Sequence, residues 1–146
     1  MPRLFCALTL PPETRMWLSS LRGGLRSARW IDPENYHVTL RFIGDVDERV
    51  ADEVAYDLTR VQRGPVPVEI AGLDTFGGRK PHSVFARVVP GAALIDLQGT
   101  LERRLQRLGL PAESRRFTPH VTIARLRGTS AREVADCLSL RGGFSA

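Results

Sequence analysis

The chain has 146 residues, the length of a single domain, and a chain of this size buries enough surface to fold without disulfides or metals. Apolar residues make up 42% and charged residues 25%, which excludes disordered and collagen-like classes. Lys and Arg number 21 against 16 Asp and Glu, a net charge of +5, and Lys80 is the one lysine. Because guanidinium groups match phosphate oxygens, the bias favours a phosphate-bearing partner, but a genome that favours arginine codons explains it equally well.

The two cysteines and the apolar start of the chain exclude two further classes. Cys6 and Cys137 lie far apart in apolar surroundings, so we expect core residues and neither a disulfide framework nor a thiolate metal site. The apolar stretch from Leu4 to Leu10 is too short to span a membrane and lacks a small-residue cleavage site. We therefore expect no signal peptide, no membrane partner and a cytoplasmic location.

The first 61 residues predict a strand, a helix, a strand and a helix from alternating and four-residue apolar spacing. The predicted ranges are a strand at 3–10, a helix from Pro12 through Leu25, a strand at 37–43 and a helix from Asp47 through Val61. Between them, Trp30-Ile31 is a short extended piece and Asp32 to Asn35 has turn chemistry.

The rest of the chain predicts the same kinds of element. Val66 to Phe76 is expected as a strand, and 77–81 as a loop. A strand at 83–89, a helix from Leu94 to Leu108, a strand at 120–124 and a helix opened by a Ser130–Glu133 capping box follow.

The order of these elements predicts an internal duplication. Strand, helix, strand, helix occurs in residues 3–61 and again in 83–140, with Phe5 to Phe85 separated by 80 residues and His37 to His120 by 83. The class is therefore α/β or α+β, with helices covering a sheet. The counterpart of the 66–76 strand would lie beyond Ala146, so we expect either a lost last strand or a chain shortened at its C-terminus.

Two of the three histidines begin the same string, His-Val-Thr, at equivalent places in the two halves. Since residues i and i+2 share a face of a strand, His37, Thr39 and Arg41 are expected on one face, and His120 and Thr122 on another. A pseudo-two-fold axis between the halves would bring both imidazoles and both hydroxyls into one cleft.

Such an array suits acid–base chemistry on a phosphodiester. An imidazole titrates near pH 6.5, so one ring can be neutral while the other is protonated. The hydroxyls can hold the non-bridging oxygens. A half-exposed strand histidine and a metal site are the alternatives, but neither motif is accompanied by Asp, Glu, Cys or a third His, so we expect no metal.

Arg29-Trp30, the run from Pro33 to Gly44 and the run from Phe117 to Arg125 together resemble the 2H phosphoesterase superfamily, in particular its RNA 2′,3′-cyclic phosphodiesterase (2′-5′ RNA ligase) branch. The resemblance covers essentially all of residues 1–146 and implies a single 2H domain with a bilobal α+β fold, in which two antiparallel sheets flank a central cleft with helices outside. The closing strands of the family have no counterpart at the end of this sequence.

The resemblance also implies an activity and its residues. The activity is cofactor-free and metal-independent opening of an RNA 2′,3′-cyclic phosphate to a 2′-phosphomonoester, with reversible 2′-5′ ligation in some members. His37 and His120 match the catalytic histidines, Thr39 and Thr122 their phosphate-holding partners, and Arg125 an arginine that reaches the phosphate. Strand parity places Arg125 on the wrong face, so a bulge or the strand end must turn it inward.

Two alternatives to this activity remain. One is a 2H phosphodiesterase acting on small cyclic nucleotide phosphates such as ADP-ribose 1″,2″-cyclic phosphate. The other is a binder of RNA ends that does no chemistry. The expected partners are RNA ends or nucleotides bearing a 2′,3′-cyclic phosphate, bound by a monomer.

Overall fold

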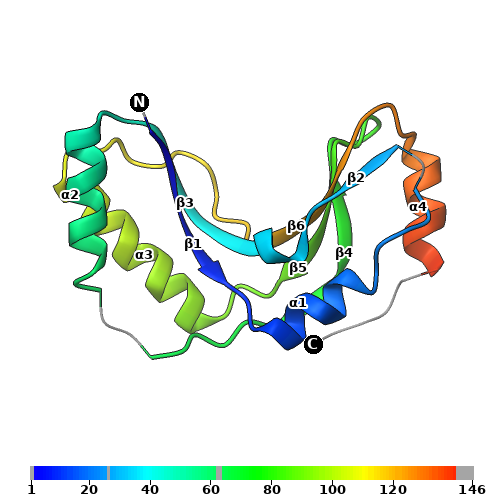
Figure 1. Ribbon diagram of the computed structural model, residues 1–146, viewed down its shortest axis with the longest axis horizontal. Helices are drawn as coiled ribbons and strands as arrows, with labels where there is room; N and C mark the ends of the chain where they lie inside the picture. The colour runs from blue at the N-terminus through cyan, green and yellow to red at the C-terminus, as the bar shows by residue number, and fades with distance from the viewer. Residues whose placement is uncertain (1, 26, 62–63, 141–146) are drawn as a thin grey trace. The chain divides into compact units, whose positions relative to one another are not determined.

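The computed structural model describes residues 2–25, 27–61 and 64–140, and it has the α+β class expected from the sequence. Within these residues the chain forms two antiparallel sheets and four α-helices (Figure 1). The chain divides into two compact units, each built from three separate segments. Of the described residues, the first contains 2–8, 39–61, 64–68 and 90–118, and the second contains 9–25, 27–38, 69–89 and 119–140.

The first unit contains a two-stranded sheet with two helices. Strands β1 (Arg3–Thr9) and β3 (His37–Asp45) pair, and helices α2 (Glu48–Leu58) and α3 (Ala92–Arg107) lie together on one side of them (Figure 1). The last residue of β1, Thr9, and the first two residues of β3 belong to the second unit. The predicted leucine stripe of α3 forms the core of this unit: Leu94, Leu97, Leu101 and Leu105 are all buried. Asp47 caps α2 as expected, because its Oδ1 accepts a hydrogen bond from Val50 N at 2.8 Å.

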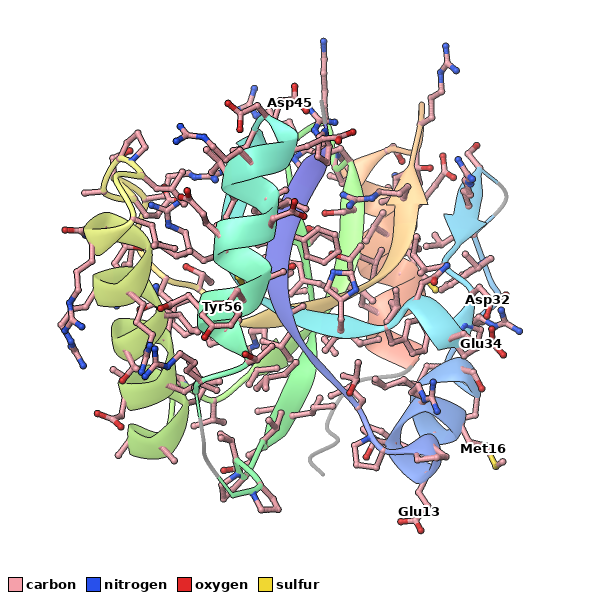
Figure 2. All side chains as sticks on the ribbon, turned by 60° about the vertical axis from the view of Figure 1, so that its left-hand side comes forward. Glu13, Met16, Asp32, Glu34, Asp45 and Tyr56 are labelled. Carbon is pink, nitrogen blue, oxygen red and sulfur yellow. The ribbon has the colours of Figure 1, made fainter. Side chains whose placement is uncertain are left out.

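An exposed ion pair joins the two strands of the same unit. Arg3 Nε of β1 and Asp45 Oδ1 of β3 are 3.8 Å apart. Figure 2 shows Tyr56 projecting from α2, and this residue is 68% exposed. Helix α2 is therefore amphipathic: Tyr56 lies on its exposed face, and Val54 on its buried face enters the core.

The second unit contains a four-stranded antiparallel sheet in the order β2-β6-β5-β4. The strands are β2 (Ala28–Trp30), β4 (Ile70–Phe76), β5 (Ser83–Val88) and β6 (His120–Leu126). Helices α1 (Pro12–Ser19) and α4 (Ala131–Leu140) and the 3₁₀ helix η1 (Pro33–Asn35) complete the unit (Figure 1). Ser130 caps α4 by accepting a hydrogen bond from Glu133 N at 3.1 Å, as the capping box predicts.

Each half of the predicted repeat contributes one helix to the unit that holds the sheet of the other half. Helix α1 follows β1 in the chain but belongs to the second unit, and α3 follows β5 but belongs to the first. Each sheet is therefore accompanied by one helix from the other half of the sequence. This is the arrangement that a duplicated chain would give if α1 and α3 are equivalent helices.

Helix α1 is shorter than predicted, since it ends at Ser19 and not at Leu25. The hydroxyls of Ser19 and Ser20 donate to carbonyl oxygens of the last turn, at 2.7 and 2.5 Å. Gly23 then has a φ of +108°, a conformation that continues no right-handed helix. Leu25 still enters the core, from a loop.

Two other predicted boundaries also move inward. Strand β4 begins at Ile70, because Pro65 and Pro67 have no N–H for a ladder and their neighbours stay outside the sheet. Helix α2 ends at Leu58, and the cap at Thr59 precedes Val61. In both cases the stretch of regularly spaced apolar residues is longer than the hydrogen-bonded helix or strand.

Arg41 is the buried ionic centre of the first unit. Its side chain is 6% exposed, and its Nε donates to Glu102 Oε2 of α3 at 2.7 Å. It also donates to the carbonyl oxygens of Phe42, at 2.7 Å, and of Pro111. Glu102 in turn accepts a hydrogen bond from Glu113 N at 2.9 Å, so the pair fixes strand, helix and the 109–118 loop together.

The hydrogen bond from Arg41, more than any other interaction, lowers the pKa of Glu102 to about 2. A carboxylate with a lowered folded pKa adds stability at pH values above its unfolded pKa. That contribution is lost as the pH falls from about 4.5, the ordinary value for Glu, to about 2.

We predict that Glu102→Gln lowers the free energy of unfolding at pH 7 by roughly 3 kcal/mol, because it leaves the Arg41 charge buried without its partner. Urea unfolding of both proteins at pH 7 and at low pH measures this. The difference between them should shrink as the pH falls from about 4.5 to about 2, since Glu102 of the unfolded chain is protonated over this range while the folded carboxyl is still charged. A variant as stable as wild type at pH 7 would contradict this account of the pair.

Candidate active site

The two His-Val-Thr strands share one burial pattern over six residues. In 37–42 and in 120–125, the first and third residues are half-buried, the second, fourth and fifth are buried, and the sixth is exposed. A regular strand would alternate throughout. In both strands, therefore, the alternation is interrupted after the fourth residue, and the residue five positions after the histidine emerges on the outer side.

In β6 the interruption is a bulge, and it places Arg125 on the same face as His120 and Thr122. On β5, Ser83, Phe85 and Arg87 alternate, so they share a face. Their cross-strand partners on β6 are Arg125, Thr122 and His120, respectively, with one extra residue between Arg125 and Thr122. Because cross-strand partners lie on the same face, Arg125 shares the face of His120 and Thr122. The predicted bulge is confirmed.

In β3 the residue on the outer side is Phe42 and not Arg41. Arg41 was expected beside His37 and Thr39; this is wrong, because its charge pairs with Glu102 inside the first unit. Phe42 is 53% exposed and occupies the position that corresponds to Arg125. Its ring centroid lies 5.9 Å from that of Phe5.

A cation lies over the Phe42 ring. The guanidinium carbon of Arg115 is 5.9 Å from the ring centroid, and Glu113 holds that guanidinium through Oε1, 3.2 Å from Arg115 Nε. The same Glu113 carries the backbone N–H that donates to Glu102. The loop that presents Arg115 is thus tied to the buried Arg41–Glu102 pair.

Aromatic rings fix the orientation of His120. Its imidazole meets Phe76 at 5.0 Å and Phe85 at 5.2 Å between centroids, in both cases edge to face. Phe76 and Phe85 stack on each other at 4.1 Å, and the third histidine, His82, stacks on Phe76 at 6.4 Å. These edge-to-face contacts favour one ring orientation. The sequence predicts no role in the site for either phenylalanine, because both are ordinary apolar strand residues there.

The backbone fixes which nitrogen of His37 can exchange a proton. His37 Nδ1 lies 2.7 Å from Asn35 O, at the end of η1, and a carbonyl oxygen only accepts, so Nδ1 carries the proton. Asp32 caps η1 by accepting a hydrogen bond from Glu34 N at 2.9 Å. In the neutral ring the lone pair is therefore on Nε2.

The second unit contains four of the five predicted site residues: His37, His120, Thr122 and Arg125. Thr39 follows on the same strand as His37 and belongs to the first unit. No group of three or more His, Cys, Asp or Glu side chains suited to a metal ion occurs in the described residues. No helix in that part of the chain is long and apolar enough to cross a membrane.

Comparison with known proteins identifies the family. The sequence model of the 2′-5′ RNA ligase superfamily matches residues 10–140, and the chain belongs to this superfamily. An RNA 2′,3′-cyclic phosphodiesterase of Aeropyrum pernix is 38% identical over 100 residues, which cover 67% of this chain and 57% of the relative.

Solved structures agree with this assignment. A crystal structure of a Thermus thermophilus protein has a TM-score of 0.75 at 25% identity, covering 90% of this chain and 78% of that one. Escherichia coli LigT in complex with 3′-AMP has a TM-score of 0.68 at 26% identity, covering 88% and 74%.

The chain covers only part of several curated relatives. It spans 57% of the Aeropyrum pernix protein, 41% of an RNA 2′,3′-cyclic phosphodiesterase of Geobacillus stearothermophilus and 61% of one from Aquifex aeolicus.

We predict that Phe76→Leu moves the NMR signals of the His82 and His120 ring protons, because both imidazoles lose the ring current of a contacting phenyl group. The free energy of unfolding should fall by about 1 kcal/mol, the usual cost of a partly buried aromatic contact. Ring-proton spectra of the two proteins under one set of conditions measure this, and an unmoved His120 signal would contradict the described packing.

Proposed function

We propose that this chain opens the 2′,3′-cyclic phosphate at the end of an RNA strand and leaves a 2′-phosphomonoester, with His37 and His120 as the acid–base pair. The observation that carries the proposal is the shared pattern of the two His-Val-Thr strands, which gives each histidine a threonine and an outward sixth residue. The names of the curated relatives support the substrate, since they are RNA 2′,3′-cyclic phosphodiesterases.

The proposed reaction needs two proton transfers. One imidazole accepts a proton from water while the water oxygen attacks phosphorus. The other imidazole donates a proton to the 3′ oxygen while the P–O3′ bond breaks, so the products are a 2′-phosphomonoester and a 3′ hydroxyl. In His37 the exchanging atom is Nε2 in either role, because Nδ1 donates to Asn35 O. A 5′ hydroxyl in place of water would form the 2′-5′ linkage named by the superfamily.

The neighbouring side chains stabilise charge in this proposal. Thr39 and Thr122 donate hydroxyl hydrogen bonds to the non-bridging oxygens of the phosphate, and Arg125 supplies the guanidinium that offsets their negative charge. Arg125 is suited to this because the β6 bulge places it on the face of His120. The rings of Phe76 and Phe85 position His120 through their edge-to-face contacts.

Phe42 is proposed as a platform for a nucleobase. It is exposed, it is flanked by Phe5, and it carries a guanidinium over its ring. A purine or pyrimidine stacks on such a ring without regard to sequence. Stacking of this kind separates RNA substrates from cyclic phosphates that lack a base.

We predict that His37→Ala and His120→Ala each lower kcat by roughly 10²–10⁴-fold, because each removes one of the two proton transfers. Hydrolysis of an oligonucleotide ending in a 2′,3′-cyclic phosphate, with circular dichroism to check folding, measures this. The wild-type kcat/KM should be bell-shaped in pH, and excess EDTA should leave it unchanged. An active double variant would overturn the proposal, and tight binding without wild-type turnover would favour a non-catalytic RNA-end binder.

Phe42→Leu should raise KM for that oligonucleotide about tenfold with little change in kcat, because a stacked base contributes roughly 1–3 kcal/mol. Tyr56→Leu, on the exposed side of α2, is the matched control and should leave both constants as in wild type. Equal constants for the Phe42 variant and the control would remove the stacking platform from the proposal.

A further inference from the structure

A second arginine lies directly beside Arg125. In the pairing of β2 with β6, Arg29 is the cross-strand partner of Arg125, and both side chains are exposed. Cross-strand partners share a face and have Cα atoms roughly 5 Å apart. Arg29 therefore stands on the face that carries His120 and Thr122, one strand further out.

This pairing is unfavourable by itself. Like charges directly opposite each other on two strands destabilise a sheet. Some other arginines are neutralised or held: Arg41 pairs with Glu102, Arg104 with Asp57, and Arg87 donates to Ala71 O. Within 2–25, 27–61 and 64–140, neither Arg29 nor Arg125 has a carboxylate or hydrogen-bond partner, although they lie directly opposite each other.

A third polar group in the same row also lacks a partner. Ser83 is the β5 partner of Arg125, it is 1% exposed, and its Oγ makes no hydrogen bond within the described residues. Buried hydroxyls are normally satisfied. The row across three strands thus combines two uncompensated cations with one unsatisfied hydroxyl, which is the chemistry that an anion satisfies.

We propose that Arg29 binds a second phosphate of the substrate, the phosphodiester that joins the terminal nucleoside to the rest of the strand. The inference rests on the proposed function, in which Arg125 takes the cyclic phosphate. Two guanidiniums that extend from neighbouring strands can each contact a different phosphate group. They therefore suit two successive phosphates of one RNA chain. The substrate class is then an RNA oligonucleotide end, and a cyclic mononucleotide, which has one phosphate, is the poorer substrate.

The test compares two dinucleotides that both end in a 2′,3′-cyclic phosphate. One has a natural phosphodiester linkage, and the other has an uncharged methylphosphonate linkage, so they differ by one charge and keep both bases. The ratio of their kcat/KM values isolates the contribution of the internal phosphate. Wild type should prefer the charged linkage by about tenfold, and Arg29→Gln should reduce this ratio to near one.

Arg132→Gln is the matched control, since it removes the same charge from an exposed position on α4. It should keep the wild-type ratio. Arg29→Lys should restore part of the preference, because a point charge still attracts the phosphate but makes no bidentate contact. The wild-type ratio should also fall as salt is raised, as for any exposed charge contact.

An Arg29→Gln variant that keeps the wild-type ratio would overturn the inference, as would an equal loss in Arg132→Gln. If wild type turned over neither dinucleotide, the proposed function would fail. The inference would then be tested by measuring the dissociation constants of the two corresponding 2′-phosphorylated dinucleotides. The ratio of these constants for the charged and uncharged linkages should change in the variants as described for kcat/KM.

Discussion

The alternation of buried and outward residues is interrupted at the same place in two strands, and the composition of the candidate site depends on this interruption. A regular strand that begins with His-Val-Thr would place its fifth residue beside the histidine and its sixth behind it. In both β3 and β6 the fifth residue is buried and the sixth faces out. This single shift decides which side chain accompanies each histidine: Phe42 in one strand and Arg125 in the other.

In β3 the interruption is linked to a buried ion pair. Arg41 is held inside by Glu102 and by carbonyl oxygens, so the next residue along the strand faces outward. The same carboxylate receives the backbone N–H of Glu113, whose side chain positions Arg115 over the Phe42 ring. A charge in the core and an aromatic ring on the surface are therefore two results of one hydrogen-bond network.

Much of the fold follows from periodicity in the sequence. The leucine stripe of α3, the caps at Asp47 and Ser130 and the strands that start at His37 and His120 are all present. Helix α1 was overextended because Leu21 and Leu25 continue its period, and only the serine hydroxyls and Gly23 end it. Apolar spacing reports which residues are buried and does not report where backbone hydrogen bonds stop.

The sequence proposes the residues of the candidate site, but it predicts their geometry only partly. The repeated motif is local, so both histidines and both threonines can be proposed directly from the sequence. The face of β3 on which Arg41 lies, by contrast, depends on its ion pair with Glu102, which is 61 residues away in the chain. The neighbour of Arg125 on β2 depends on strand register, and no local pattern encodes that.

In the proposed reaction, two imidazoles distant in sequence act on one phosphorus atom. The most direct measurement is an NMR titration with a nucleoside 2′-phosphate, the product class, followed at the ring protons of His37 and His120. We predict that both rings respond with one dissociation constant at one ligand per chain. A response of one ring alone, or two rings titrating with different constants, would contradict the account.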